Sequence, residues 1–196
     1  VKKIFDKSMK TFKDKGYEVV DITLPNISYS LVAYYIIMPA EVSSNMFRYD
    51  GVRYGLHVDG LDGIADYGES RGAGFGREVV RRILLGTYVL SSGYYDAYYN
   101  KANIIRQMVT DDFLKAFESV DIIATPTTPA PAFKIGEKTT DPMAMYLEDI
   151  FTITANLTGM PAISLPFGSI VSEGKNLPIG IRLTARHGDE ETLFSA

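Results

Sequence analysis

The sequence predicts an α/β fold, because patterns typical of helices and of strands alternate along its 196 residues. Apolar residues repeat at helical spacing near the start and again in the middle of the chain. A short apolar run, VDIIATP, has the length of a buried strand. Two further runs, PAISLPFG and LPIGIRLTA, flank the polar segment SIVSEGKN, so we expect them to form an antiparallel hairpin.

The composition limits the class of protein. Hydrophobic residues make up 46% of the chain, which suffices for a buried core. The net charge is −4 with both signs mixed, so the sequence indicates no dedicated nucleic-acid-binding face. There is no cysteine, and His57 and His187 lack metal-ligand spacing, so we expect no metal site. No apolar run approaches the roughly 18 residues that span a membrane.

The first quarter of the chain predicts a helix, a strand and a second helix. The first helix ends at Gly16, and its apolar face comprises Val1, Ile4, Phe5, Met9 and Phe12. The segment YEVVDITLP alternates apolar and polar residues before Pro25, which predicts a strand. The apolar segment SYSLVAYYIIM predicts a helix up to Met38, and we expect Pro39 to bend or end it.

The rest of the chain begins with residues 50–74, whose seven glycines predict a long surface loop. A long helical region follows from Gly76, and Gly93 is expected to break it. Four tyrosines after this break fall on one helical face, and they are Tyr94, Tyr95, Tyr98 and Tyr99. The segment TPTTPAPAFKIGE is expected to be extended because of its prolines, and a helix is predicted near residues 142–157.

Both ends of the sequence fall inside helical patterns. The chain begins with Val1 rather than Met, and it ends with DEETLFSA, which is typical of the first turns of a helix. We therefore expect residues 1–196 to be a fragment.

Three serines are candidates for a catalytic nucleophile, and none has the context that the chemistry requires. Ser70 is the central residue of a G-x-S-x-G match, but DGIADY before it is not the buried strand of a nucleophile elbow. Ser91 and Ser92 lie in a helical run, where a serine more often bonds to its own helix. An activated serine also needs a neighbouring base that is itself held in place. We therefore expect Ser70 to lie in a flexible glycine- and serine-rich loop and Ser91 and Ser92 to pack in or bond to their helix, the alternative for the pair being a Ser/Lys arrangement with Lys101.

Charged and aromatic side chains in apolar helices are better candidates for binding than for catalysis. One guanidinium of the pair Arg81–Arg82 is suited to bind a carboxylate through two parallel hydrogen bonds. Helical periodicity does not show which of the two arginines has this role. Asp149 lies in YLEDIFTI and is suited to receive an ammonium group. Tyr34 and Tyr35 lie in an apolar helix. The alternative is a solvated helix face for the arginines, a helix cap or a solvated position for Asp149, and the core for the two tyrosines.

Five segments together resemble the amidase-signature family, and within it the glutaminase subunits of tRNA-dependent amidotransferases. The segments are YYIIMPAEVSSNMFRYDGVRYG, GFGREVVRRILLGTYVLSSGYYDAYYNKA, TPTTPAPAFKIGE, YLEDIFTITANLTGMPAISLPFG and LPIGIRL. The resemblance implies that residues 1–196 are the C-terminal portion of a single amidase domain. It also implies a mixed sheet flanked by helices, which would be incomplete in this fragment.

The resemblance implies that Tyr35, Arg82 and Asp149 bind the substrate glutamine. The catalytic Ser–cis-Ser–Lys triad of the family belongs to a glycine- and serine-rich segment that this sequence lacks. We therefore expect no catalytic residue in this chain and no amidase activity from it alone.

The same resemblance implies partners and a cytoplasmic location. Ammonia released from glutamine would pass to a partner that amidates Glu-tRNA(Gln) or Asp-tRNA(Asn), so the B and C subunits of the amidotransferase are the expected partners. Transfer RNA would be reached through the partner subunit, which would also use ATP and magnesium, and no cofactor is expected in this chain. The alternatives are part of a stand-alone amidase-signature hydrolase or a non-enzymatic binding module.

Overall fold

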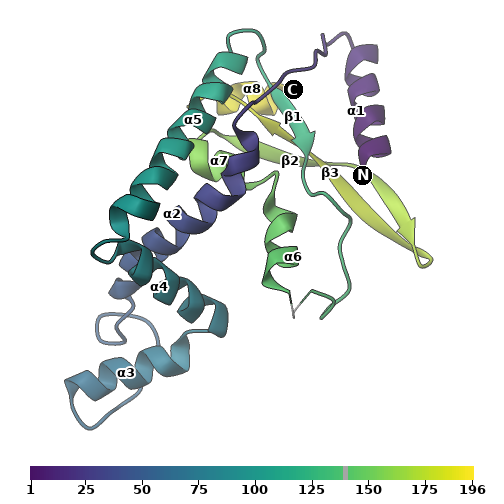
Figure 1. The fold of residues 1–196 in the computed structure, drawn as a ribbon. Coiled ribbons are helices and arrows are strands. Elements are labelled where there is room, and N and C mark those ends of the chain that lie inside the picture. Colours follow the sequence, from purple (N-terminus) through teal and green to yellow (C-terminus); the bar gives the residue numbers. More distant parts are fainter. Residues whose placement is uncertain (139–140) are drawn as a thin grey trace. The chain divides into compact units, whose positions relative to one another are not determined.

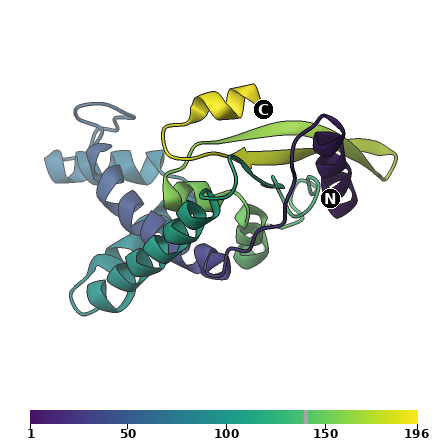
Figure 2. The same ribbon diagram turned by 90° about the horizontal axis from the view of Figure 1, so that it is seen from above.

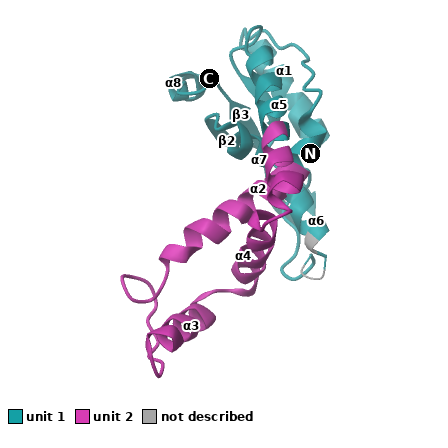
Figure 3. Ribbon diagram, turned by 60° about the vertical axis from the view of Figure 1, so that its left-hand side comes forward, with its two compact units in different colours: residues 1–31, 105–196 teal, residues 32–104 magenta. Residues whose placement is uncertain are grey.

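The computed structural model describes residues 1–138 and 141–196, which form two compact units (Figure 1, Figure 3). Unit 1 comprises residues 1–31 and 105–196, and unit 2 comprises residues 32–104. The α/β class is confirmed, because helices and a three-stranded sheet make up the described residues. None of the described helices is both long and apolar enough to cross a membrane.

The described sheet belongs to unit 1 and is antiparallel. Its strands are β1 (Ile123–Pro126), β2 (Ala162–Ser172) and β3 (Lys175–Thr184), and their order is β1-β3-β2. The predicted hairpin is confirmed as β2–β3, which Figure 2 shows from above. Glu173 and Gly174 connect the two strands with φ values of 50° and 75°. Two successive positive φ angles are typical of the tight turns that suit the twist of a hairpin.

One face of the sheet is apolar and is covered by helices. Successive side chains of a strand point to opposite faces, so Ile181 and Leu183 share a face with Ala124 and Ile163. Together with Ala185 and with Leu193 of α8 (Glu190–Ser195), Ile181 and Leu183 form a buried apolar cluster. The helix α1 (Lys2–Asp14) packs against this cluster with Phe5, Met9 and Phe12. The apolar stripe predicted for the first helix is therefore the stripe that covers the sheet.

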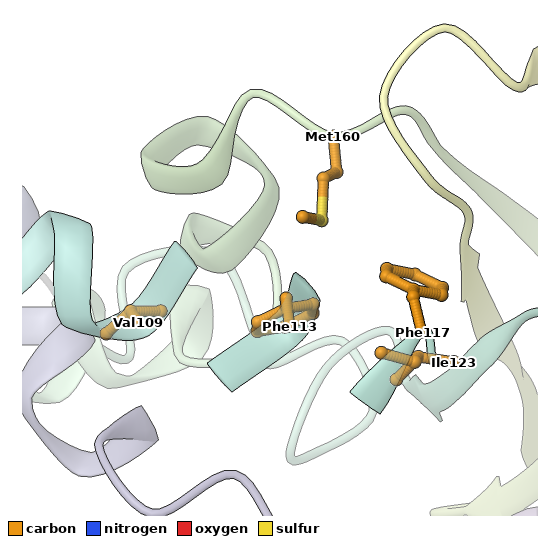
Figure 4. Close-up of a cluster of buried hydrophobic side chains, with 5 residues drawn as sticks. All are labelled: Val109, Phe113, Phe117, Ile123 and Met160. Atoms are coloured by element: carbon orange, nitrogen blue, oxygen red, sulfur yellow. The ribbon is translucent and has the colours of Figure 1, made fainter. Parts of the chain in front are cut away.

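A second apolar cluster lies around α5 (Lys101–Ala116). Figure 4 shows Val109, Phe113, Phe117, Ile123 and Met160, all of which are buried. Ile123 is adjacent in β1 to Ala124 of the first cluster, so β1 contributes to both clusters with alternate side chains.

The predicted helix near residues 142–157 consists of three shorter elements. They are α6 (Pro142–Tyr146), the 3₁₀ turn η4 (Leu147–Asp149) and α7 (Ile153–Thr158). Asp141 caps α6 by accepting hydrogen bonds from the backbone N–H groups of Met143 and Ala144. Gly159 ends α7 with a φ of 72°, a left-handed conformation that glycine adopts readily.

The strand predicted for YEVVDITLP is wrong. Residues 17–24 are irregular, and a short 3₁₀ turn, η1 (Ile27–Tyr29), follows them. The alternating pattern describes a strand only where a neighbouring strand supplies hydrogen-bond partners, and no described strand pairs with this segment. Asn26 instead anchors the segment to α5, because its backbone N–H donates to Asp112 Oδ2 at 2.7 Å.

All regular elements described in unit 2 are helices. They are α2 (Ser30–Asn45), which begins in unit 1, η2 (Met46–Arg48), α3 (Gly63–Gly74), α4 (Arg77–Leu90) and a π-helix, η3 (Tyr95–Asn100). The expectation that this helix ends at Pro39 is wrong, since α2 continues through Pro39 to Asn45. The predicted break at Gly93 is confirmed, because α4 ends at Leu90 and Gly93 has a φ of 86°.

The prediction of a loop throughout residues 50–74 is wrong for its second half, which forms α3. The carboxylate of Asp62 starts this helix by accepting from the N–H groups of Ile64 and Ala65. Arg71 then ties it to the segment before the loop, because its guanidinium donates to the carbonyls of Met46 and Tyr49, both at 3.0 Å. These contacts outweigh the low helix propensity of the glycines.

Candidate functional site

Two helices of unit 2, α2 and α4, carry the predicted substrate-binding residues Tyr35 and Arg82. Tyr35 is half-buried on α2. Arg82 reaches α2 from α4, and its Nη1 lies 3.2 Å from the Sδ of Met38. The helices approach closely at Gly86, where an added Cβ would lie 1.9 Å from the carbonyl oxygen of Pro39. The packing of α4 on α2 thus places Arg82 beside the helix that carries Tyr35.

The guanidinium of Arg82 is held by an acidic neighbour one turn earlier. Its Nε donates to Glu78 Oε1 at 2.9 Å. Burial of Arg82 disfavours its charged form, but the hydrogen bond and charge of Glu78 outweigh burial and raise its pKa. Tyr35 and Tyr34 contribute to the same rise. Arg82 is therefore a fixed positive charge in a half-buried setting.

Arg81 differs from Arg82 in exposure and in orientation. Its Nη1 donates to the other oxygen of the same carboxylate, Glu78 Oε2, at 2.9 Å. The side chain of Arg81 is 46% exposed, whereas that of Arg82 is 27% exposed. Sequence periodicity did not separate the two arginines, but their contacts do, because Arg82 is the one that touches α2. Glu78 and Met38 were not singled out from the sequence, although the i, i+4 spacing of Glu78 and Arg82 is a recognisable signal.

The third predicted residue, Asp149, belongs to unit 1. It ends the 3₁₀ turn η4 and is exposed. Its backbone carbonyl accepts hydrogen bonds from the backbone N–H of Thr152 at 2.9 Å and from the Thr152 hydroxyl at 3.0 Å. Asp149 therefore sits at the start of a tight turn that leads into α7, with Tyr35 and Arg82 in the other unit.

Ser91 ends a helix, and Ser92 follows it. The Ser91 hydroxyl donates to the carbonyl of Tyr88 at 2.7 Å, and its backbone N–H donates to the same carbonyl at 3.1 Å. A serine that caps a helix in this way contacts a backbone acceptor rather than a catalytic base. The expectation that the two serines lie within a helix is corrected, because α4 ends at Leu90 and both are exposed beyond it.

Two of the cavities among the described residues are each formed within one unit, and neither of these two is lined by Tyr35, Arg82 or Asp149. The larger, of about 930 Å³, belongs to unit 1 and has Phe5, Met9 and Phe12 of α1 in its wall. The smaller, of about 150 Å³, belongs to unit 2 and adjoins Ser70 and Arg71. Among residues 1–138 and 141–196, no group of three acidic, histidine or cysteine side chains is placed to hold a metal ion.

Comparison with protein families and curated proteins gives a consistent result. The family model described as Amidase matches residues 1–194. The A subunit of glutamyl-tRNA(Gln) amidotransferase from Caldanaerobacter subterraneus subsp. tengcongensis is 53% identical over 196 residues, which are 100% of this chain and 39% of that protein. The protein of the same name from Azorhizobium caulinodans is 55% identical over 194 residues, 98% of this chain and 39% of its own length. The chain thus spans about two fifths of these relatives.

Comparison with solved structures agrees. The crystal structure of the glutamyl-tRNA(Gln) amidotransferase A subunit of Thermotoga maritima matches 95% of this chain and 35% of its own, with a TM-score of 0.66 and 40% identity. A 6-aminohexanoate cyclic dimer hydrolase matches 97% of this chain with a TM-score of 0.66 but only 19% identity, which bears on the fold alone. The described units thus correspond to part of a larger fold in both neighbours.

Proposed function

The chain belongs to the amidase family, and from this premise we propose that it is the substrate-binding portion of the glutaminase subunit of a tRNA-dependent amidotransferase. The observation that carries the proposal is the identity of 53–55% to A subunits over almost the whole chain. In this proposal the full-length protein releases ammonia from glutamine for the conversion of Glu-tRNA(Gln) to Gln-tRNA(Gln).

Glutamine is recognised in this proposal by groups that match its two charges. Free glutamine carries an α-carboxylate and an α-ammonium group, which simple amides lack. Arg82 would bind the carboxylate, since its guanidinium is always charged and has donors beyond those that contact Glu78 and Met38. Asp149 would receive the ammonium group, and Tyr35 would contact the substrate beside Arg82. The assignment of Asp149 to the same substrate rests on the family resemblance.

Catalysis is assigned to residues outside this chain. The family resemblance implies a Ser–cis-Ser–Lys triad in a glycine- and serine-rich segment, and the candidate serines Ser70 and Ser91 of the present sequence have other contacts. Ser91 caps α4, and Ser70 is bonded to the loop before α3. In this proposal the triad forms an acyl-enzyme with the side-chain carbonyl of glutamine and releases ammonia as the leaving group.

The partners of the full-length protein follow from the same proposal. Ammonia would pass to a B subunit that binds tRNA and uses ATP and magnesium, and a C subunit would complete the complex. This chain would hold no cofactor. The cytoplasmic location implied by the resemblance also stays a prediction.

Substitution of the charged residues in the full-length protein, assembled with its partner subunits, tests the proposal. We expect Arg82→Ala or Asp149→Ala to lower kcat/KM for glutamine by roughly ten- to a hundredfold, because a hydrogen bond to a charged group is worth about 1.5–3 kcal/mol. Hydrolysis of an uncharged amide without the α-amino and α-carboxylate groups should change much less, since the triad would be intact.

Arg81→Ala is the matched control, because Arg81 contacts the same Glu78 carboxylate and is more exposed. Its kcat/KM for glutamine should stay within about twofold of the wild-type value. If Arg81→Ala lowered kcat/KM for glutamine more than Arg82→Ala did, Arg81 rather than Arg82 would be the residue that binds the substrate. Equal losses on glutamine and on the uncharged amide would contradict the recognition role.

A further inference from the structure

Three side chains of unit 1, one from α5, one from β3 and one from the segment after β3, donate hydrogen bonds to backbone carbonyls of residues 151–158. Arg182 of β3 donates to the carbonyl of Phe151. Arg106 of α5 donates through Nε to the carbonyl of Leu157 at 2.7 Å. His187, just after β3, lies with Nε2 2.7 Å from the carbonyl of Thr158, and because a carbonyl only accepts, Nε2 carries the proton. The segment that follows Asp149 is thus fixed at both ends.

Arg182 is the unusual member of this set, because it is a buried cation. The residue is 6% exposed, and its strand register places it directly opposite Thr125 on one side and Ser164 on the other. No ion pair to Arg182 is seen among the described residues, and burial lowers its pKa. Burying a cation without a carboxylate costs free energy that a neutral side chain of the same size would not cost. Stability alone therefore does not account for an arginine at this place.

The contact of Arg182 lies inside the turn that carries Asp149. The carbonyl of Asp149 accepts from both the N–H and the hydroxyl of Thr152, which closes a turn over residues 149–152. Phe151 is a member of that turn, and its carbonyl accepts from Arg182. A hydrogen bond from a strand of the sheet to the middle of an exposed turn restricts the positions that the turn can adopt.

We infer that Arg182 is a positioning residue for Asp149. By holding the carbonyl of Phe151, it fixes the turn of residues 149–152 and so the direction in which the Asp149 carboxylate is presented to the ammonium group of the substrate. This inference rests on the proposed function, because it presumes that Asp149 binds glutamine. Arg182 itself would not touch the substrate, since the residue is buried and its guanidinium donates to the Phe151 carbonyl.

The test uses Arg182→Met in the full-length protein with its partner subunits. Methionine fills a similar volume and removes the donor to Phe151. The expected result is a KM for glutamine that rises by roughly three- to tenfold while kcat changes less than about twofold, because binding is impaired and the triad is not. Kinetic constants for an uncharged amide without an α-ammonium group should stay at their wild-type values.

Two further variants separate positioning from simple loss of structure. Arg182→Lys keeps a cationic donor of similar reach, so its KM for glutamine should lie between the values of the wild type and of Arg182→Met. Arg106→Met is the matched control, because it removes the same kind of contact at Leu157, eight residues from Asp149. Whatever its effect on the melting temperature, Arg106→Met should leave the KM for glutamine at its wild-type value.

The possible failures are distinguishable. If Asp149→Ala raises the KM but Arg182→Met and Arg182→Lys do not, the inference is wrong and the proposed function stands. If Asp149→Ala has no effect, the proposed function of this residue fails and the inference fails with it. Should Arg182→Met not fold, Arg182→Gln, whose shorter neutral side chain keeps a polar group at this place, decides through the exchange rates of the amides of residues 150–152. Rates above the wild type together with a raised KM support the inference, and unchanged rates with an unchanged KM contradict it.

Discussion

The side chain of Ser70 closes the loop that precedes α3. Its hydroxyl accepts a hydrogen bond from the backbone N–H of Val58 at 2.8 Å and lies 3.3 Å from the carbonyl of Val58, to which it donates. The residue is 3% exposed. A nucleophile needs access to its substrate and a neighbouring base, whereas both hydrogen-bonding functions of this hydroxyl are used by the backbone. Ser70 is therefore part of the framework of unit 2.

His57, in the same loop, contacts two acceptors. Its Nδ1 lies 2.8 Å from the carbonyl of Gly51, and its Nε2 lies 3.0 Å from Asp59 Oδ1. Both ring nitrogens carry protons only in the imidazolium form, so two acceptors favour protonation. The hydrogen bond to Asp59 is the largest cause of a raised pKa for His57, and the carbonyl of Gly51 adds to it.

We predict that the loop around His57 is more stable in mildly acidic than in alkaline solution. A raised folded-state pKa means that this stabilisation is fully present below the unfolded pKa of about 6.5 and is lost as the pH rises through the folded pKa. Proton NMR titration of the His57 ring should give a pKa above that ordinary value. Asp59→Asn should lower it, whereas Glu69→Gln, outside these contacts, should leave it unchanged. A wild-type pKa at or below 6.5 would contradict the assignment.

At the scale of elements, the contact between α2 and α4 depends on one glycine. A Cβ built on Gly86 would lie 1.9 Å from the carbonyl oxygen of Pro39 and 2.8 Å from the Ser43 hydroxyl oxygen. The first of these atoms is helix backbone and cannot rotate away. Any side chain at this position must therefore push α4 away from α2, and Arg82 lies one turn before it on α4.

We predict that Gly86→Ala destabilises the full-length protein by more than about 2 kcal/mol, since overpacking against backbone forces a shift of the helices. Gly68→Ala is the control, because a Cβ on this helical glycine meets nothing within 4 Å. It should stabilise α3 by roughly 0.5–1 kcal/mol, the usual gain of alanine over glycine in a helix. Thermal unfolding of the two variants measures both effects, and a Gly86→Ala variant as stable as the wild type would refute the packing argument.

The π-helix η3 arranges the tyrosines after the break at Gly93. The rings of Tyr88, Tyr94 and Tyr98 form a row, with centroids 4.3 Å and 6.0 Å apart, and those of Tyr95 and Tyr99 lie 5.1 Å apart. The hydrogen bond that the Tyr88 hydroxyl makes to Tyr94 stabilises the neutral form of Tyr88 and raises its pKa to about 12. The four tyrosines for which the sequence predicted one helical face thus stack as two i, i+4 pairs, Tyr94 with Tyr98 and Tyr95 with Tyr99.

At the scale of the whole molecule, the chain spans about two fifths of its curated relatives. Its described residues form two units, each with helices of its own, and one of them contains the three-stranded sheet. The outer edges of β1 and β2 do not pair with other described strands. Edge strands are positions where a sheet accepts further strands.

We predict that residues 1–196 expressed alone do not hydrolyse glutamine. The physical reason is that the serine hydroxyls of Ser70 and Ser91 are engaged by backbone groups rather than by a base. Ammonia release by the purified chain should equal that of a buffer blank, while the full-length protein is active under the same conditions. Activity that is lost on Ser91→Ala or Ser92→Ala would contradict this prediction and place a nucleophile in the chain.

Several features of the molecule were determined by the sequence itself, because they depend on local physics. The hairpin β2–β3 follows from two apolar runs around a turn, and the end of α4 follows from Gly93. The apolar stripe of α1 also needs no tertiary information, since the spacing of Phe5, Met9 and Phe12 is helical. The family resemblance likewise came from segments read in order along the chain.

Other features were decided by tertiary contacts. Residues 17–24 alternate like a strand but have no described strand to pair with, and the glycine-rich residues 63–74 form a helix because Asp62 and Arg71 hold it. Periodicity left Arg81 and Arg82 equivalent, and only the packing of α4 on α2 distinguishes them. Arg182 looks like one polar residue in an apolar strand, and its partner, Phe151, is 31 residues away in sequence. Such contacts depend on where the chain returns in space, which local patterns do not encode.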